Sequence, residues 1–308
     1  MSSTICITGG AGFIGSHIAD AIVAKGHEVI ILDDLSSGSK HNVPDGAKLV
    51  VADIRSNEAA QVLHDRKVDV LIHHAAQMDV RRSVENPAFD ADVNLLGLLN
   101  LLEAARKTGV RQVIFASTGG AIYGEQDVHP ADENHPARPV SPYGVAKLAG
   151  ERYLYFYHCQ YGLNVTCLRY ANVYGPRQNP HGEAGVVAIF MHKLLRNEQA
   201  VINGDGKQSR DYVFVGDVVK ANVAALGRSG FDIFNVGTGI ETDVNQLFSE
   251  VRRALGTGAP ATHGEAMPGE QLRSSISSAK LRDQLGVSPD TLFADGIQET
   301  AEWFKTHR

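Results

Sequence analysis

Thr8–Gly15 reads TGGAGFIG and directly follows a short apolar run, Thr4–Thr8. A tight turn from a strand into a helix needs glycine where the backbone bends and where a ligand's pyrophosphate comes close. The N-terminus of the helix then offers free N–H groups and the positive end of its dipole to phosphates. The stretch predicts a dinucleotide-binding turn, and a glycine-rich turn with only structural duties is the alternative. The candidate binding residues are Gly9, Gly12, Phe13, Ile14 and Gly15.

Acidic residues follow the next two apolar runs. Asp33 stands about 20 residues past the glycines, where a carboxylate can accept hydrogen bonds from an adenosine ribose. A carboxylate there repels a 2′-phosphate, so the sequence favours NAD over NADP. Asp34 continues the same polar turn, while Asp53 and Ile54 follow the third run and could cap the adenine. Polar loops after strands are the structural alternative for these residues.

Short β-branched runs alternate with longer helical patterns through the first half of the chain. The predicted strands are Thr4–Thr8, Glu28–Leu32, Lys48–Val51, Val68–His73, Gln112–Ala116 and Asn164–Arg169. The predicted helices are Phe13–Lys25, Ser56–Arg66, Pro87–Thr108 and Ser141–Tyr161. This alternation indicates an α/β fold, a doubly wound parallel sheet of the Rossmann type with helices on both faces.

The pattern loosens after residue 170, where loops rich in Gly, Pro and Asn precede mixed short elements. We expect a NAD-binding Rossmann domain over residues 1–170, to which segments near 208–240 return. Residues 171–308 are expected mainly to form a smaller C-terminal α/β substrate-binding domain.

Composition excludes several classes of protein. The net charge of −6 disfavours non-specific binding to nucleic-acid phosphates. No apolar run approaches the roughly 18–20 residues that a membrane span needs. The three cysteines and the histidines lack metal-ligand spacing, so we expect no metal. Sparse, odd cysteines and the absence of a secretory pattern at the N-terminus predict a cytoplasmic protein with reduced thiols.

A tyrosine and a lysine stand four residues apart near the start of the last predicted helix, at Tyr143 and Lys147. Residues at this spacing share a helix face. A lysine ammonium beside a phenol favours the phenolate, so the pair predicts a tyrosine of lowered pKa that can act as a general base. A packed aromatic ring beside a solvated lysine is the structural alternative.

Hydroxyl groups follow the fifth predicted strand, at Ser117 and Thr118. Residues at the carboxyl end of a parallel strand face the ligand crevice. Either hydroxyl could therefore bond a reacting oxygen, and satisfying the backbone groups at the strand end is the alternative role.

These motifs together resemble the extended short-chain dehydrogenase/reductase family, and within it the UDP-glucose 4-epimerases. The similarity covers the whole chain and includes the runs His74–Ala76, Ser117–Glu125, Asn172–Arg177, Gly204–Tyr212 and Asn235–Gly239. It implies a tightly held NAD and epimerisation at C4 of a UDP-hexose through a transient 4-keto sugar. Other nucleotide-sugar chemistry, by a dehydratase or decarboxylase, and non-catalytic dinucleotide binding are the alternatives.

The resemblance also implies roles for individual residues. Tyr143, Lys147 and Thr118 would be catalytic, with Tyr143 as base and Thr118 on the sugar 4-oxygen. Beyond the glycine turn, the cofactor would contact Asp33, Asp34, Ser37, Gly38, Asp53, Ile54, Ala75, Ala76, Gln77, Asn94, Ser117, Tyr143, Lys147 and Tyr170. The substrate would contact Thr118, Tyr143, Asn172, Val187, Val201, Asn203, Arg210, Arg273 and Ser274. Asn172 and Arg210 would hold the diphosphate, and Val201 and Asn203 would lie near the uracil.

Two further expectations concern the reaction and its substrate. Related dehydratases carry an Asp-Glu pair after the catalytic threonine, and decarboxylating relatives carry a glutamate there. Here those places are Gly119 and Gly120, which can neither donate nor accept a proton, so simple epimerisation is favoured. Ser274 matches a position beside the sugar C2, and its small side chain predicts turnover of N-acetylated UDP-hexosamines as well. The resemblance finally implies a homodimer formed through the Leu95–Leu102 helix and the Tyr143 helix.

Overall fold

A parallel sheet of seven strands forms the centre of the computed structural model, which describes residues 2–181, 185–266 and 271–307. The strand order is β10-β6-β5-β4-β1-β2-β3. The strands are β1 (Thr4–Thr8), β2 (Glu28–Asp33), β3 (Ala47–Val51), β4 (Val70–His73), β5 (Gln112–Thr118), β6 (Asn164–Tyr170) and β10 (Phe231–Val236). The order reverses at β1, which pairs with both β2 and β4, as in a doubly wound sheet. The predicted α/β Rossmann fold is confirmed.

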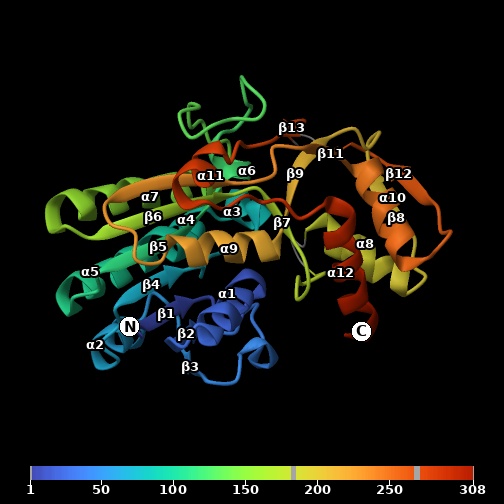
Figure 1. Cartoon of the computed structure of the whole chain (residues 1–308). Helices are drawn as coiled ribbons and strands as arrows, with labels where there is room; N and C mark the ends of the chain where they lie inside the picture. Colours follow the sequence, from blue (N-terminus) through green and yellow to red (C-terminus); the bar gives the residue numbers. More distant parts are fainter. Residues whose placement is uncertain (1, 182–184, 267–270, 308) are drawn as a thin grey trace.

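Helices cover both faces of this sheet (Figure 1). Side chains of β1 alternate between the two faces, with Cys6 in one core cluster and Ile5 and Ile7 in the other. One face packs against α2 (Asn57–Asp65), α5 (Gly97–Thr108) and α7 (Pro142–Tyr161), and the other against α1 (Phe13–Ala24), α9 (Val215–Ala225) and α11 (Ala279–Leu285). Because the strands are buried on both faces, they read as continuous apolar runs in the sequence.

A second group of elements lies beside the central sheet, at the right of Figure 1. It contains β7 (Asn172–Tyr174), α8 (Val186–Leu195), β8 (Ala200–Asn203), β9 (Ser209–Phe214), β11 (Glu241–Asp243), α10 (Val244–Leu255), β12 (Ala261–Gly264), β13 (Arg273–Ser274) and α12 (Phe293–Thr306). β9 pairs with β7, β11 and β13, and β8 pairs with β12. Between these elements the chain crosses back, since α9 and β10 belong to the layers of the central sheet.

The helix predicted over Pro87–Thr108 is confirmed in its bounds, but a π-helical turn in its middle divides it into three parts. They are α4 (Pro87–Ala91), a π-helical turn η2 (Asp92–Leu96) and α5. A π-helical turn inserts extra backbone into a helix and often marks a functional site. Here it coincides with the inward turn of Asn94, whose side chain bonds the main chain at Gln77. Three short helices are additional to the prediction: η1 (Lys40–Asn42), α3 (Val80–Glu85) and α6 (Gly119–Ile122).

Candidate active site

The glycine turn between β1 and α1 has the properties of a phosphate cradle. Gly9 has a φ of +67°, and a Cβ placed on it would lie 2.7 Å from the amide nitrogen of Ala75. A Cβ on Gly15 would overlap the carbonyl oxygen of Gly9. Gly12 is the N-cap of α1 and contributes no capping side chain, and the first turn of the helix holds no acidic residue. The uncapped helix N-terminus therefore fits the pyrophosphate of a dinucleotide.

Asp33 anchors this turn from the end of β2. Its two carboxylate oxygens accept hydrogen bonds from the amides of Ala11 and Leu35, each at 2.9 Å. The side chain is only 6% exposed, and burial raises its pKa. Gly38 approaches so closely that a Cβ there would lie 2.9 Å from Oδ1 of Asp33. Each carboxylate oxygen can accept a further bond, so a contact with the ribose stays a prediction. The neighbouring Asp34 accepts bonds from Ser36.

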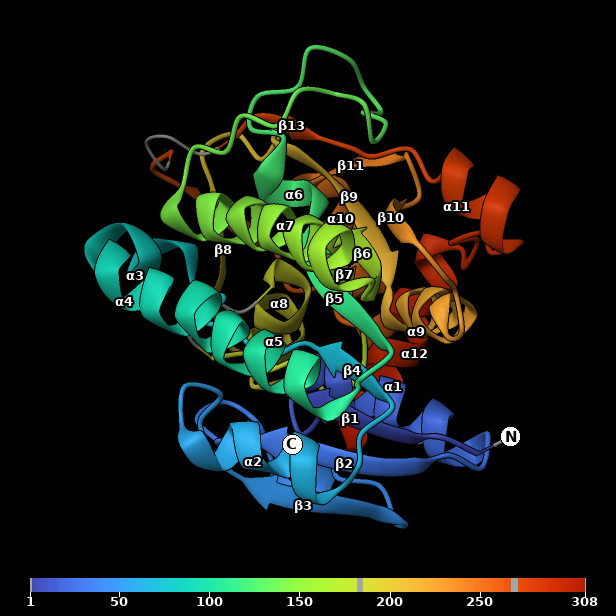
Figure 2. The same ribbon diagram turned by 90° about the vertical axis from the view of Figure 1, so that its left-hand side faces the viewer.

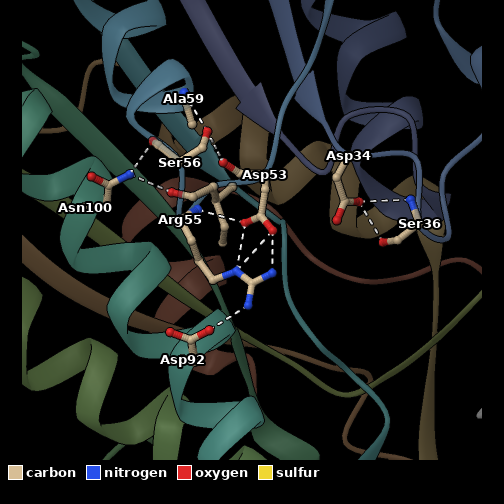
Figure 3. A network of polar contacts seen from close by, with 9 residues as sticks. Asp34, Ser36, Asp53, Arg55, Ser56, Ala59, Asp92 and Asn100 are labelled. Atoms are coloured by element: carbon tan, nitrogen blue, oxygen red, sulfur yellow. Dashed lines mark hydrogen bonds and ion pairs between the residues drawn. The ribbon is translucent and has the colours of Figure 1, made fainter.

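Asp53, the predicted adenine cap, is held by an arginine two residues later (Figure 3). Nε of Arg55 donates to both carboxylate oxygens of Asp53, at 3.0 and 3.1 Å, and Nη1 donates to Asp92 at 2.6 Å. The guanidinium lowers the pKa of the Asp53 carboxyl. Arg55 thus ties the end of β3 to the π-helical turn. The side chain of Ile54 is 5% exposed and lies in the core, so only its main chain remains for the predicted cofactor role.

The loop after β4 is clamped by a buried amide pair. Asn94 accepts from the amide of Gln77 at 2.9 Å and donates to its carbonyl oxygen at 2.8 Å. Both side-chain amides also donate to Oδ1 of Asp90, at 2.9 and 3.0 Å. The other oxygen of Asp90, Oδ2, is buried and has no hydrogen-bond partner among the residues that the structure describes. Asn94 therefore shapes the loop that carries Ala75 and Ala76, the predicted cofactor contacts.

Tyr143 and Lys147 lie one turn apart near the start of α7. The helix begins after Ser141, whose hydroxyl accepts a bond from the amide of Gly144 at 3.1 Å. The ammonium of Lys147 donates to the carbonyl oxygen of Ala116 at 3.0 Å and lies 5.8 Å from the centre of the Tyr143 ring. Their predicted placement on one helix face is confirmed.

The predicted lowering of the tyrosine pKa by the chain's own groups is wrong. Burial raises the pKa of Tyr143, and the negative charge of Asp90 raises it further. Burial also lowers the pKa of Lys147 to about 8, an effect that Asp90 opposes. Burial therefore outweighs the effect of the lysine on the pKa of the phenol, and an additional positive charge at the site would favour the phenolate.

Thr118 ends β5 with its hydroxyl near Gly120. Its oxygen accepts a bond from the amide of Ala121 at 3.2 Å, which leaves its own O–H free to donate. A Cβ on Gly120 would lie 3.5 Å from Oδ1 of Asn172 and 3.9 Å from Oγ1 of Thr118, so these two polar atoms border the same glycine. A Cβ on Gly119 would lie 2.5 Å from Cδ1 of Ile276. This position has little room for an acidic side chain.

Three predicted contact residues use their side chains elsewhere. The hydroxyl of Ser117 donates to Glu151 at 2.7 Å. The hydroxyl of Tyr170 is buried and bonded to His74 and Asn222, at 3.0 and 2.8 Å. The side chain of Val187, at 1% exposure, packs in the apolar core of the second group of elements. Local bonding and packing thus engage all three side chains, and the ligand contacts expected of these residues stay predictions.

Arg210 lies on β9 between Ser209 and the buried Asp211. Its Nη1 donates to the carbonyl oxygen of Ser209 at 2.8 Å. Asp211, at 1% exposure, accepts four bonds: from the amide and hydroxyl of Thr238 and from the amides of Gly239 and Ile276, at 2.7–3.2 Å. This carboxylate therefore fastens β9 to the loop after β10 and to the chain beyond β13.

The remaining predicted substrate residues lie on β8 and β13. Val201 is 44% exposed and Asn203 is half-buried. Arg273 is exposed and makes a two-point ion pair with Glu241, at 2.6 and 2.9 Å, which competes with the predicted substrate contact. Ser274, at 3% exposure, is the strand partner of Arg210. No cluster of three metal-ligating side chains occurs among the described residues, and no helix there could cross a membrane.

A family model described as the NAD dependent epimerase/dehydratase family matches residues 5–237. The chain belongs to this family. It is similar to the solved UDP-glucose 4-epimerase of Thermotoga maritima with UDP-glucose, at 44% identity and a TM-score of 0.96, over 99% of both chains. It also resembles the UDP-glucose 4-epimerase of Thermus thermophilus in complex with NAD, at 44% identity and a TM-score of 0.93, over 98% and 99% of the two chains.

A further similar structure is the UDP-N-acetylglucosamine 4-epimerase of Methanobrevibacter ruminantium in complex with UDP-N-acetylmuramic acid. It shares 33% identity over 100% of this chain and 99% of that chain, with a TM-score of 0.94.

Proposed function

We propose that this protein interconverts UDP-glucose and UDP-galactose by NAD-dependent epimerisation at C4. The observation that carries the proposal is the pairing of Tyr143 and Lys147 on α7 with Thr118 at the end of β5, next to two glycines. These three side chains can transfer one proton and hydrogen-bond one oxygen of the substrate. The site lacks the acid at 119 or 120 that elimination of a hydroxyl group needs, which disfavours a dehydratase.

The residues present fit NAD. The uncapped N-terminus of α1 is assigned to the pyrophosphate, and Asp33, at the end of β2, is assigned to the ribose. When bound, NAD supplies a two-electron acceptor whose reduced form can return the electron pair to the same carbon. Its oxidised ring is cationic, and this charge adds to that of Lys147 in favouring the phenolate of Tyr143.

The chain's own groups handle the proton and the oxygen. Tyr143 takes the proton of the sugar 4-hydroxyl on its phenol oxygen and later returns it. Lys147, fixed to Ala116, carries a positive charge up to a pH of about 8 and favours the phenolate while charged. Thr118 donates its O–H to the 4-oxygen, since its own acceptor site is used by Ala121. These three groups act on the 4-oxygen and its proton, so they do not themselves fix the configuration at C4.

The diphosphate and the uracil are assigned to the second group of elements. Arg210 presents a planar guanidinium suited to phosphate oxygens, and Asn172 borders the same space as Thr118. Val201 and Asn203, on β8, are assigned to the uracil side.

N-acetylated UDP-hexosamines form a second substrate class in this proposal. Ser274 has a small side chain at the position assigned to the sugar C2 and lies directly beside Arg210 in the sheet. The similarity to a UDP-N-acetylglucosamine 4-epimerase supports the same extension.

The proposal also includes a homodimer in the cytoplasm. α5 and α7 lie on the face turned toward the viewer in Figure 2. α7 exposes large apolar side chains, since Val145, Tyr153, Phe156 and Tyr161 are 41–52% exposed. Such a set is typical of an interaction surface. All three cysteines are free, as expected for a reducing compartment.

A product assay tests the proposed activity. The purified protein is incubated with UDP-galactose without added cofactor, and nucleotide sugars are separated after increasing times. UDP-glucose should accumulate to an equilibrium ratio with no net formation of NADH. A 4-keto-6-deoxy product, or stoichiometric NADH, would show a different reaction. UDP-N-acetylglucosamine in place of UDP-galactose tests the second substrate class.

A further inference from the structure

A third residue lies on the catalytic face of α7. Glu151 follows Tyr143 and Lys147 at the same four-residue interval, so the three side chains form one line along the helix. Glu151 is 1% exposed and Lys147 is 3% exposed. Lys147 donates to the carbonyl oxygen of Ala116, and Glu151 accepts from the hydroxyl of Ser117 at 2.7 Å. Two successive residues of β5 are therefore fixed to α7 immediately before Thr118.

The charge of Glu151 is balanced by a buried arginine of the neighbouring strand. Nε and Nη2 of Arg169 donate to the two oxygens of Glu151 at 2.9 and 2.6 Å. Arg169 on β6 is the direct strand partner of Ser117 on β5, and both side chains meet at the same carboxylate. The Glu151 carboxylate thus joins one helix and two strands at a single point.

The same arginine also holds the far end of the turn that carries Thr118. Nη1 of Arg169 donates to the hydroxyl of Tyr123 at 2.9 Å, and this hydroxyl donates to Asn235 at 2.7 Å. Tyr123 directly follows the short helix α6, which Thr118 caps. The turn is therefore held on both sides, by Ser117 before Thr118 and by Tyr123 after α6.

Stability alone gives a weak reason for such a pair. Desolvating two charges offsets much of their attraction, and well-packed apolar residues often replace a buried ion pair without loss of stability. A bidentate pair does, however, define positions and angles that apolar packing leaves adjustable. Here the ion pair defines the position of the Thr118 hydroxyl relative to the Tyr143 phenol.

We propose that Glu151 is a positioning residue for the epimerisation: through Ser117 and Arg169 it fixes the hydroxyl of Thr118 relative to the phenol of Tyr143. This inference rests on the proposed function. Displacing a reacting group by about 1 Å can reduce a rate by about 100-fold. Loss of the Ser117 link should therefore lower kcat and leave KM and cofactor binding nearly unchanged.

Ser117→Ala tests the proposal because it removes the link and leaves the ion pair in place. Thr166→Val is the matched control. Thr166 is fully buried on β6, and its hydroxyl has no partner among the described residues. Wild type is first assayed with UDP-galactose, so that failure of the proposed function itself is seen separately as absence of product. A double variant, Glu151→Leu with Arg169→Leu, removes the whole pair without leaving one charge buried.

For Ser117→Ala we expect kcat to fall about 10- to 100-fold, as for a misplaced catalytic group, with KM within about twofold of wild type. Its NAD content and Tm should stay at the values of Thr166→Val, which should retain wild-type kcat. The double variant should show at least the same loss of kcat. Wild-type kcat in Ser117→Ala would overturn the proposal. So would a fall in kcat that is matched by falls in Tm and NAD content, since that would show a merely structural role.

Discussion

The ammonium nitrogen of Lys147 lies 5.8 Å from the centre of the Tyr143 ring, one turn along α7, with its hydrogen bond directed at the end of β5. The lysine is thus anchored beside the phenol without bonding its oxygen in any interaction that the structure describes. Burial of both groups dominates their pKa values: it raises that of Tyr143 and lowers that of Lys147 to about 8. A further positive charge next to the phenol would lower its pKa and favour the phenolate.

Tyr143→Phe should remove the proton acceptor and leave the fold intact. We expect kcat to fall about 1,000-fold, since a positioned general base contributes about 100- to 10,000-fold. The variant should still bind NAD, because the glycine turn is unchanged. The measurement is kcat with UDP-galactose together with NAD content after denaturation.

Tyr155→Phe is the matched control, because Tyr155 lies on the same helix and is 51% exposed. It should have wild-type kcat. Wild-type activity in Tyr143→Phe would remove this tyrosine from proton transfer.

Asp90→Asn should move the pH dependence of the reaction. The charge of Asp90 raises the pKa of Tyr143, so its removal should lower that pKa and make the phenolate available at lower pH. The acid limb of the pH profile of kcat should therefore shift to lower pH. The hydrogen bonds from Gln77 and Asn94 should persist, since both use Oδ1 and the amide replaces the oxygen without a partner.

Nearby histidines do not obscure this test. Burial and the charge of Lys147 lower the pKa of His74 to about 3 and that of His73 well below its usual range, so both are neutral across the assay. Asp92→Asn, on the exposed side of the π-helical turn, serves as the control and should leave the profile unchanged. An acid limb that stays in place or moves to higher pH in Asp90→Asn would contradict the account.

Gly237→Ala should lower stability through the buried Asp211 cluster. A Cβ there would lie 2.5 Å from Oδ2 of Asp211 and 2.6 Å from Cγ1 of Ile276. Overpacking of this kind destabilises by about 1–3 kcal/mol, which thermal unfolding measures as a lower Tm. Gly258→Ala is the control, because a Cβ at Gly258 meets nothing within 4 Å. Equal Tm values for the two variants would show that the cluster adapts without strain.

Ser274→Tyr should separate the two proposed substrate classes. The larger ring would occupy the space assigned to a substituent at the sugar C2, so turnover of UDP-N-acetylglucosamine should be lost while UDP-galactose is still converted. Parallel assays of the two sugars, with Ser277→Tyr as a neighbouring control, measure this ratio. An unchanged ratio in Ser274→Tyr would place the C2 substituent elsewhere.

The sequence predicts the central architecture well because its signals are local. Each buried strand is a continuous apolar run, and the glycines that open α1 are required by backbone approaches within the turn itself. The π-helical turn inside the helix Pro87–Thr108 was not predicted, because Asn94 turns inward there to bond Gln77, a contact between residues of different elements. A helical pattern does not encode such a bond.

The residues of the candidate site also include some that local sequence patterns predict and some that they do not. Tyr143 and Lys147 follow from helical spacing, whereas Glu151 and Asp211 were missed because their partners come from distant strands and loops. Asp90 was missed as well, although its partner Asn94 lies only four residues later. The four-residue continuation from Lys147 to Glu151 was a signal that could have identified one of them. The local bonds of the Ser117 and Tyr170 hydroxyls could not be predicted, because a hydroxyl at a strand end bonds whichever partner folding brings nearest.

The central claim is that one enzyme site removes hydrogen from C4 and returns it to the same carbon. UDP-galactose carrying deuterium at C4 tests it directly, with the isotope content of the product measured by mass spectrometry and its position by NMR. The account predicts UDP-glucose that retains deuterium at C4. UDP-glucose with hydrogen from water at C4, or no UDP-glucose at all, would contradict it.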